Sequence, residues 1–286
     1  MLTPKELERY SRQIQLPDLG EEGQKALKNT TALVSGVGGL GGTVALYLAI
    51  AGIGKLILVR GGELRLDDMN RQILMTDDWV GKTRVTKAKE TLQQINPDVE
   101  VEAIAEYINP DNVDALVQRA DIALSCAHNF PERDLLNAAC VRWNKPMIEA
   151  AMNSMEAYLT TIVSGKTPCL SCMFPEKPDW DRRAFGVLGA VSGTLACLTA
   201  LEAIKLITGL GKPLLGQLLN MDLANGSFQK LRLYKDPECP VCGKQAEVQR
   251  SGGAREQIRQ AISHQQLTIN NQPITKQEKN HVRNFN

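Results

Sequence analysis

Apolar and polar residues alternate in a regular rhythm along the first half of the chain. Five short apolar runs predict buried strands at residues 32–35, 55–59, 101–108, 121–126 and 146–150. Apolar residues at helical spacing predict intervening helices at residues 43–51, 85–95, 110–120 and 132–143. Because strands that alternate with helices form a sheet covered on both faces, we predict a mostly parallel, doubly wound α/β sheet.

The pattern changes after residue 151, where the strands no longer alternate with helices. Three segments predict antiparallel strands at residues 157–163, 217–223 and 228–234. A long helix is predicted among them at residues 186–207. Residues 245–286 are polar and rich in Gln and Asn, which predicts a mobile tail. We therefore predict one domain over residues 1–244, with an antiparallel C-terminal extension, followed by this tail.

A short helix is predicted at the start of the chain. Residues 3–6 have the spacing of a capping box, and Pro4 occupies the first helical position. The helix is expected to extend far enough to carry Arg12. This charged segment lacks the apolar core of a secretory signal peptide, so we expect a cytoplasmic protein.

Charge and composition narrow the range of partners. The chain has 33 Lys and Arg residues against 32 Asp and Glu residues. Nucleic-acid binders usually carry an excess of positive charge, so we expect no nucleic-acid partner. The apolar stretch 185–201 contains several polar residues and is followed by Glu202 and Lys205, which favours a buried helix. We expect no membrane segment.

A glycine-rich motif follows the first predicted strand and precedes a helix. Residues 36–41 read Gly-Val-Gly-Gly-Leu-Gly, which allows backbone N–H groups and the positive end of a helix to approach phosphates. The motif makes the predicted fold Rossmann-like. The acidic residue that grips a ribose at the end of the second strand is replaced here by Arg60, which could meet a 2′-phosphate. The glycine motif alone therefore leaves an NADP-dependent reductase open.

Four of the seven cysteines form two Cys-x-x-Cys pairs. Cys169 and Cys172 form one pair, and Cys239 and Cys242 form the other. Each pair has the spacing to clamp one side of a tetrahedral zinc ion, and four thiolates leave no open position for catalysis. We therefore predict a structural zinc site, with a redox dithiol as the alternative. The remaining cysteines, expected to pack in the core, are Cys126, Cys140 and Cys197.

Several motifs in one register extend the comparison beyond the glycine motif. They lie at residues 9–14, 36–41, 69–72, 95–97, 200–205 and 239–243. Together they resemble the HesA/MoeB/ThiF family of E1-like adenylyltransferases, over about residues 7–243. Within the family, residues 60–68 are most similar to the HesA branch, which is encoded beside cyanobacterial nitrogen-fixation genes.

The resemblance implies a reaction that uses ATP and Mg²⁺. In such proteins the C-terminal glycine carboxylate of a small β-grasp sulfur carrier or ubiquitin-like protein attacks the α-phosphate of ATP. Pyrophosphate leaves, and the resulting acyl-adenylate can accept sulfur. This chemistry requires positioning and cationic stabilisation more than a protein base. The resemblance also implies a homodimer, and the nitrogen-fixation link implies a role in sulfur or metal-cofactor assembly.

The resemblance assigns roles to individual residues. It implies that Arg71, Gln72 and Arg84 contact the triphosphate, and that Arg12 reaches the site of the neighbouring subunit. It implies nucleotide contacts for a further set of residues: Gly36, Gly38, Gly39, Gly41, Asn70, His128 and Asn129.

Five positions depart from the family pattern: Arg60, Gly62, Asp68, Arg84 and His128. The pattern has an aspartate at the position of His128, where relatives approach magnesium, and a neutral imidazole is a poor ligand for this ion. Glu63, Asp67 or Asp68 could supply a carboxylate instead. Besides the active enzyme, these departures leave open a catalytically inactive scaffold that still binds a carrier protein.

Overall fold

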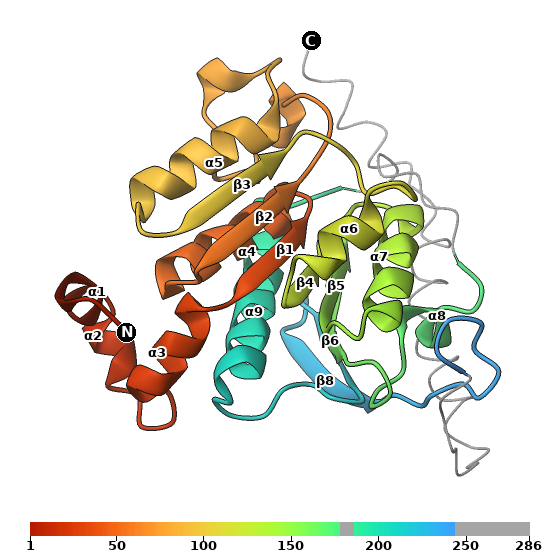
Figure 1. The fold of residues 1–286 in the computed structure, drawn as a ribbon. Helices are drawn as coiled ribbons and strands as arrows, with labels where there is room; N and C mark the ends of the chain where they lie inside the picture. The colour runs from red at the N-terminus through yellow and green to blue at the C-terminus, as the bar shows by residue number, and fades with distance from the viewer. Residues whose placement is uncertain (178–185, 244–286) are drawn as a thin grey trace. The chain divides into compact units, whose positions relative to one another are not determined.

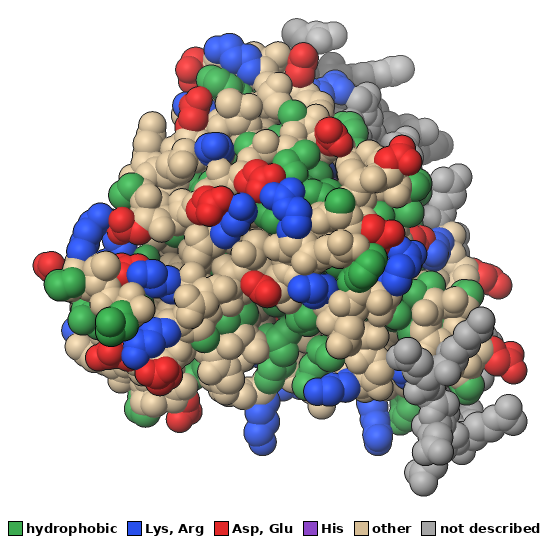
Figure 2. Space-filling view, viewed as in Figure 1, with side chains coloured by type: hydrophobic (Ala, Val, Ile, Leu, Met, Phe, Trp, Pro, Cys, Tyr) green, Lys and Arg blue, Asp and Glu red, His purple; other side chains and the backbone are tan. Residues whose placement is uncertain are grey.

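The computed structural model describes residues 1–177 and 186–243 (Figure 1 and Figure 2), so the predicted tail at 245–286 lies outside the described residues. The strands within the described part are β1 (Thr31–Ser35), β2 (Lys55–Val59), β3 (Glu100–Ile104), β4 (Ile122–Ser125), β5 (Met147–Asn153), β6 (Glu156–Ile162), β7 (Gln217–Asp222) and β8 (Ser227–Arg232). They form one sheet in the order β3-β2-β1-β4-β5-β6-β7-β8 (Figure 1).

The strand directions confirm the predicted α/β fold. Strands β1 to β5 pair in parallel, whereas β6, β7 and β8 pair antiparallel to their neighbours. The chain order runs outward from β1 to β3 and then returns to place β4 on the other side of β1. Ligands of open α/β sheets bind where the order reverses, at the carboxyl ends of the strands. The C-terminal ends of β1 and β4 are therefore the expected place for a site.

Helices cover both faces of the sheet. Their bounds are α1 (Pro4–Arg9), α2 (Ser11–Ile14), α3 (Gly20–Lys28), α4 (Gly39–Ala51), η1 (Leu66–Asp68), η2 (Asp77–Trp79), α5 (Arg84–Ile95), α6 (Val113–Gln118), α7 (Phe130–Arg142), α8 (Leu170–Met173) and α9 (Gly189–Thr208). Helices α4, α5 and α9 pack on one face, and α6 and α7 pack together on the other (Figure 1). This division follows from right-handed crossovers in opposite directions from β1.

The core lies between the sheet and the pair α4 and α9. Helix α4 buries Val44 and Leu48, and α9 buries Leu195 and Ala200 in the same cluster. Complete burial of each large apolar side chain stabilises the fold by about 1.5–3 kcal/mol relative to its exposure. The two helices that flank the reversal point are thus fixed by packing, which gives the ends of β1 and β4 a rigid surrounding.

Helix α9 is, among the described helices, the one with the length and apolarity to cross a membrane. Length and composition alone are weak evidence, because core helices of globular proteins have the same properties. In this chain α9 packs against α3, α4, β5 and β6. This packing agrees with the buried helix predicted from the sequence.

The N-terminal segment differs from the prediction. The expected single helix is divided at Tyr10 into α1 and α2, so Arg12 lies on the second helix. The buried Tyr10 side chain accepts a hydrogen bond from Asn96 Nδ2 at 2.9 Å, which anchors the chain where the helix breaks. Helix α3 was not predicted, because its buried positions include Gly23 and Gln24 and give little apolar periodicity.

Several element boundaries also differ. Helix α4 begins at Gly39, so the second half of the glycine motif is helical rather than a turn. Helix α6 is shorter than predicted because the Asn109 side chain accepts hydrogen bonds from the Asp111 and Asn112 amides and holds a turn there. Helix α7 begins earlier than predicted, at Phe130, where the preceding residue caps it. Strand β5 extends beyond its predicted end because it forms a hairpin with β6.

Candidate functional site

A cavity of about 420 Å³ lies at the point where the strand order reverses. Its lining comes from the glycine motif after β1, from Arg60 after β2, from the segment that includes η1, from residues after β4, and from the segment that leads into α9. This volume lies within the usual range of small-molecule sites. The position agrees with the one expected from the strand order.

The glycine motif permits close approaches that side chains would block. A Cβ atom at Gly41 would lie 1.9 Å from the Gly36 carbonyl oxygen, and one at Gly39 would lie 2.7 Å from Ser192 Oγ. Gly36 itself has a φ of +102°, which side-chain-bearing residues rarely adopt. Gly38 precedes the first turn of α4 without a side-chain cap, so the N–H groups of that turn face the cavity side. This arrangement suits the binding of a phosphate.

Asp68 holds two arginines beside the glycine motif. Its Oδ1 accepts a hydrogen bond from Arg71 Nη2 at 2.8 Å, and its Oδ2 accepts one from Arg84 Nη2 at 2.7 Å. Asp68 is only 6% exposed and Arg84 only 4%. One buried carboxylate thus orients two guanidinium groups that line the cavity. Because Asp68 is committed to these arginines, it is a poor replacement for the missing magnesium ligand.

Gln72 contributes an amide with unused hydrogen-bonding capacity. Its Nε2 lies 3.9 Å from the position that a Gly38 Cβ would take. Its Oε1 is buried and has no hydrogen-bond partner among the described residues. Buried polar atoms nearly always have a partner, so a bound ligand is a natural one for this amide.

Arg60 and His128 contact each other across the cavity lining. Arg60 Nη1 lies 2.8 Å from His128 Nδ1, and the guanidinium carbon lies 5.2 Å from the centre of the Tyr107 ring. Because arginine is only a donor, this hydrogen bond requires Nδ1 to act as the acceptor, which describes a neutral imidazole. Two departures from the family pattern are therefore coupled in space.

Asn70 and Asn129 have structural contacts that the sequence did not reveal. Asn70 Nδ2 donates to the Val187 carbonyl at 2.9 Å and so joins the η1 segment to the start of α9. Asn129 caps α7, because its Oδ1 accepts a hydrogen bond from the Glu132 amide at 2.8 Å. Asn70 lines the cavity and Asn129 does not.

The structure brings together most of the residues expected to bind the nucleotide. Those that line the cavity are Gly36, Gly38, Gly39, Asn70, Arg71, Gln72, Arg84 and His128. Gly41 lies behind the loop, and Arg12 is exposed on α2 and does not line the cavity of its own chain. A contact of Arg12 with a neighbouring subunit stays a prediction.

Arg133 lines the cavity and was missed in the sequence. It lies on α7, where its Nη1 forms an ion pair with Glu149 and donates to the Ala150 carbonyl at 2.9 Å. Tyr158 donates a hydrogen bond of 3.1 Å to the same Glu149 oxygen. Burial raises the pKa of Glu149, although the adjacent guanidinium opposes this effect. The available signal was a pair of opposite charges, Arg133 in a predicted helix and Glu149 in the next predicted strand.

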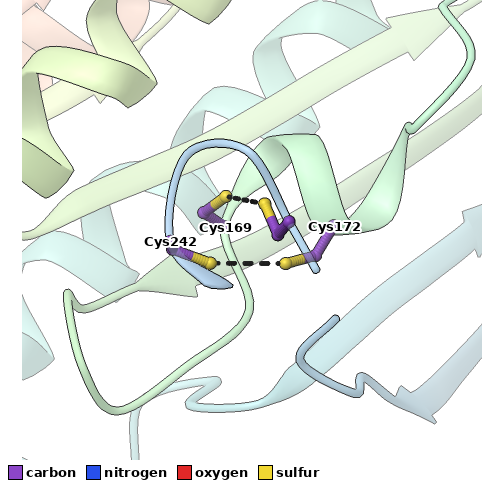
Figure 3. A group of neighbouring side chains, drawn as sticks. Cys169, Cys172 and Cys242 are labelled. Carbon is purple, nitrogen blue, oxygen red and sulfur yellow. Dashed lines mark hydrogen bonds between the residues drawn. The ribbon is translucent and has the colours of Figure 1, made fainter. Parts of the chain in front are cut away.

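The two Cys-x-x-Cys pairs form one cluster (Figure 3). Cys169 Sγ lies 3.6 Å from Cys239 Sγ, Cys172 Sγ lies 3.4 Å from Cys242 Sγ, and all four sulfur atoms lie within 4.8 Å of one another. Tetrahedral zinc with bonds of about 2.3 Å places its sulfur ligands about 3.8 Å apart. The four cysteines therefore fit a zinc ion, as predicted.

Two of the three remaining cysteines differ from the expectation of core packing. Cys140 is buried, but Cys197 is exposed and Cys126 lines the cavity. Burial raises the pKa of Cys126 to about 12, so its thiol is neutral at ordinary pH. Cys126 is therefore not an activated nucleophile.

Comparison with known proteins supports the resemblance found in the sequence. Residues 10–241 match the ThiF family. The chain belongs to the ThiF family. Within that family it is 74% identical over 245 residues to "Protein HesA, heterocyst" of Trichormus variabilis, with 86% of this chain and 92% of the relative covered. It is 40% identical over 249 residues to "Adenylyltransferase and sulfurtransferase MOCS3" of Drosophila sechellia, with 85% and 55% covered. The resemblance to the HesA branch is confirmed.

Solved structures show the same fold for this ThiF family member. The crystal structure of E. coli MccB with ATP matches with a TM-score of 0.73 and 30% identity, covering 82% of this chain and 73% of MccB. The structure of PaaA matches with a TM-score of 0.72 and 25% identity, covering 82% and 85%. MccB has also been solved with MccA, at a TM-score of 0.71 and 29% identity over 82% of this chain and 74% of MccB.

Proposed function

We propose that this protein adenylates the C-terminal glycine carboxylate of a small β-grasp sulfur carrier or ubiquitin-like protein, with ATP as co-substrate. The observation that carries this proposal is the shared cavity, in which an uncapped helix start, Arg71 and Arg84 meet around one space. The relatives named adenylyltransferases and the MccB structures with ATP and with MccA support it.

The proposed step needs little from the protein beyond orientation and positive charge. A carboxylate oxygen forms a bond to the α-phosphorus, the bond to the bridging oxygen breaks, and pyrophosphate leaves. The first-turn N–H groups of α4 and the guanidinium groups of Arg71 and Arg84 offset the negative charge of the phosphates. Asp68 keeps both guanidinium groups in place before the ligand binds, which lowers the cost of reorganisation.

Magnesium finds few protein ligands in this cavity. The carboxylates among its described lining are Asp67 and Asp68, and each forms an ion pair with at least one arginine. Mg²⁺ prefers oxygen ligands, and His128 offers a nitrogen. The donor set therefore fits the ion poorly.

The cysteine cluster is proposed to hold a structural zinc ion. Cys169 immediately precedes α8 and Cys172 lies within it, whereas Cys239 and Cys242 follow β8. Zinc bound to all four would join two segments that are about 70 residues apart in sequence. Four thiolates close the coordination sphere, so the ion would stabilise the fold and would not bind substrate.

A homodimer is proposed from the exposed side of α4 and α9. Tyr47 and Ile50 on α4 are 44% and 47% exposed, and Leu201 on α9 is 47% exposed. Large apolar side chains exposed on packed helices are typical of surfaces that another chain covers. Arg12, on α2, would reach the neighbouring site in this dimer.

Pyrophosphate exchange tests the proposed activity. The purified, zinc-loaded protein would be incubated with ATP, labelled pyrophosphate and candidate β-grasp carriers that end in Gly-Gly. Carrier-dependent exchange supports the proposal, whereas absence of exchange with every carrier from the same genome contradicts it. Loss of growth on N₂, but not on ammonium, after deletion of the gene would support the proposed link to nitrogen fixation.

A second candidate function is a catalytically inactive scaffold that binds the carrier. It is favoured by the contact between Arg60 and His128, which fills the places of two acidic residues of the family pattern. Calorimetric titration with ATP and with NADPH distinguishes the candidates. ATP binding supports the enzyme, carrier binding without ATP binding supports the scaffold, and NADPH binding would support the reductase.

A further inference from the structure

The cavity continues beyond the glycine motif toward the ends of β4 and β5. This part of the lining includes Cys126, Arg133 and Met152. Arg133 is the charged residue among these three, and the other two are apolar or neutral. The arginines that suit phosphates, Arg71 and Arg84, are held by Asp68 of η1, whereas Arg133 lies on α7.

Arg133 is held rigidly from one side. Its Nη1 contacts Glu149 on β5 and donates to the Ala150 carbonyl at 2.9 Å, while Tyr158 on β6 donates to Glu149 at 3.1 Å. Arg133 is 3% exposed and Glu149 is 0% exposed. Three elements of the core therefore fix the guanidinium before any ligand arrives.

The other side of the guanidinium has hydrogen-bonding capacity left. Arg133 Nε is buried and has no partner among the described residues, although arginine carries five N–H donors in a planar fork. A buried donor without a partner is rare in a folded protein, and here it belongs to a residue that lines a cavity. Planar forks of this kind recognise carboxylates by two parallel hydrogen bonds.

We propose that Arg133 binds the terminal carboxylate of a polypeptide that enters the cavity. This inference rests on the proposed function and names the residue that positions its acceptor substrate. The pairing with Glu149 leaves this part of the cavity without net charge, so recognition depends on the hydrogen-bonding fork more than on attraction. The apolar neighbours favour a slender tail without charged side chains, as two terminal glycines provide.

The test measures peptide binding to the intact protein without nucleotide. A fluorescein-labelled peptide that ends in Gly-Gly with a free carboxylate is compared with the same peptide as a C-terminal amide, by fluorescence anisotropy. The native protein is expected to bind the acid at least about tenfold more tightly than the amide, since a charge-assisted bidentate contact is lost in the amide. Because no nucleotide is needed, the result is independent of adenylation.

The variant Arg133→Lys keeps the charge beside Glu149 and removes the fork. It is expected to bind the acid about tenfold more weakly and to lose the preference over the amide. The matched control is Arg142→Lys on the same helix, where the arginine is exposed and pairs with Asp114. This control should behave as the native protein.

Stability is checked by thermal unfolding of each variant. If Arg133→Lys does not fold, the double variant Arg133→Gln with Glu149→Gln removes both buried charges together, which is far less disruptive than removal of one. It should also lose the preference for the acid. The proposal is overturned if the native protein shows no preference, or if either folded variant retains it. If the native protein prefers the acid but shows no pyrophosphate exchange, the result would instead contradict the proposed adenylation.

Discussion

Arg60 and His128 lie 2.8 Å apart, and their contact joins the end of β2 to the end of β4 above the glycine motif. The family pattern has acidic residues at both positions. Two such acids would repel each other, whereas a guanidinium and a neutral imidazole share a hydrogen bond. The two substitutions are therefore best understood as one change, in which a hydrogen bond between two side chains takes the place of two acidic groups.

This exchange predicts unusual tolerance toward the ribose. Arg60 cannot accept a hydrogen bond from a ribose hydroxyl, so we expect 2′-deoxy-ATP to bind within about threefold of ATP. Arg60→Asp restores an acceptor, and a hydrogen bond to a charged group contributes about 1.5–3 kcal/mol, so this variant should prefer ATP by about tenfold to a hundredfold. Calorimetric titration of both nucleotides measures the ratio. Equal ratios in the native protein and the variant would contradict the prediction.

Asp68 is predicted to support both stability and nucleotide binding. Asp68→Asn removes the charge that two buried or half-buried guanidinium groups share, and such a loss costs about 3–5 kcal/mol when the remaining charges stay buried. Urea unfolding measures the change in the free energy of unfolding, and calorimetry should show weaker ATP binding. The control is Asp67→Asn, because the Asp67 side chain is 71% exposed and should change stability by less than about 0.5 kcal/mol.

Acid is predicted to weaken the attachment of the N-terminal helix. Lys28 donates a hydrogen bond to Glu6 and, together with the Thr3 amide, lowers the pKa of Glu6 from 4.5 to about 2. Because this pKa is depressed in the folded state, the stabilisation is complete above pH 4.5 and is lost as the pH falls toward 2. We expect about 1 kcal/mol after screening by solvent.

Comparison of the native protein with Glu6→Gln checks the pH prediction. The native protein should be more stable at pH 6, and the difference in the free energy of unfolding should vanish near pH 2. A difference that stays constant over this pH range would show that the charge of Glu6 does not contribute. Lys5→Gln is the control, since Lys5 is largely exposed and its contact with Asp98 lies at the surface.

Zinc is predicted to bind with one ion per chain and to stabilise the fold. Cys239→Ser should lose the ion, and a loss of about 3 kcal/mol would lower the Tm by about 10 °C in a domain of this size. Metal analysis and thermal unfolding check both effects. Cys197→Ser is the control, since Cys197 is exposed and lies outside the cluster, and it should keep both zinc and Tm.

The elements of the α/β half could be predicted because each has a local signal. Buried parallel strands appear as short apolar runs, and the glycine motif and the two cysteine pairs are visible from spacing alone. The predicted helix boundaries were wrong where a side-chain cap determines them, as with the Asn129 cap of α7. Division of the first helix at Tyr10 depends on a hydrogen bond to Asn96, which lies 86 residues away.

The site could be predicted only in part, for the same reason. The resemblance pointed to Arg71, Gln72 and Arg84, and all three line the cavity, but the role of Asp68 in holding two of them depends on side-chain geometry. No motif pointed to Arg133, because its pairing with Glu149 depends on how α7 packs against β5. Sequence patterns thus identified residues that line the cavity better than the residues that orient them.

The exposed apolar side of α4 and α9 is predicted to be the interface of the dimer. Tyr47→Glu and Leu201→Glu each place a charge where a second copy is proposed to bind, which is strongly unfavourable when the charge is desolvated. Light scattering after size-exclusion chromatography should show a dimer for the native protein and a monomer for both variants. Phe228→Glu is the control, because Phe228 is 52% exposed on β8, away from both helices.

Arg12 allows the same dimer to be tested through its activity. Arg12→Ala and Arg71→Ala should each be inactive in pyrophosphate exchange, because one removes the residue supplied to the neighbouring subunit and the other disables its own site. When the two variants are mixed and allowed to exchange subunits, about half of the chains form mixed dimers, each with one intact site. The mixture should therefore recover about a quarter of the native activity. If the mixture stays inactive although mixed dimers form, Arg12 acts within its own chain or not at all.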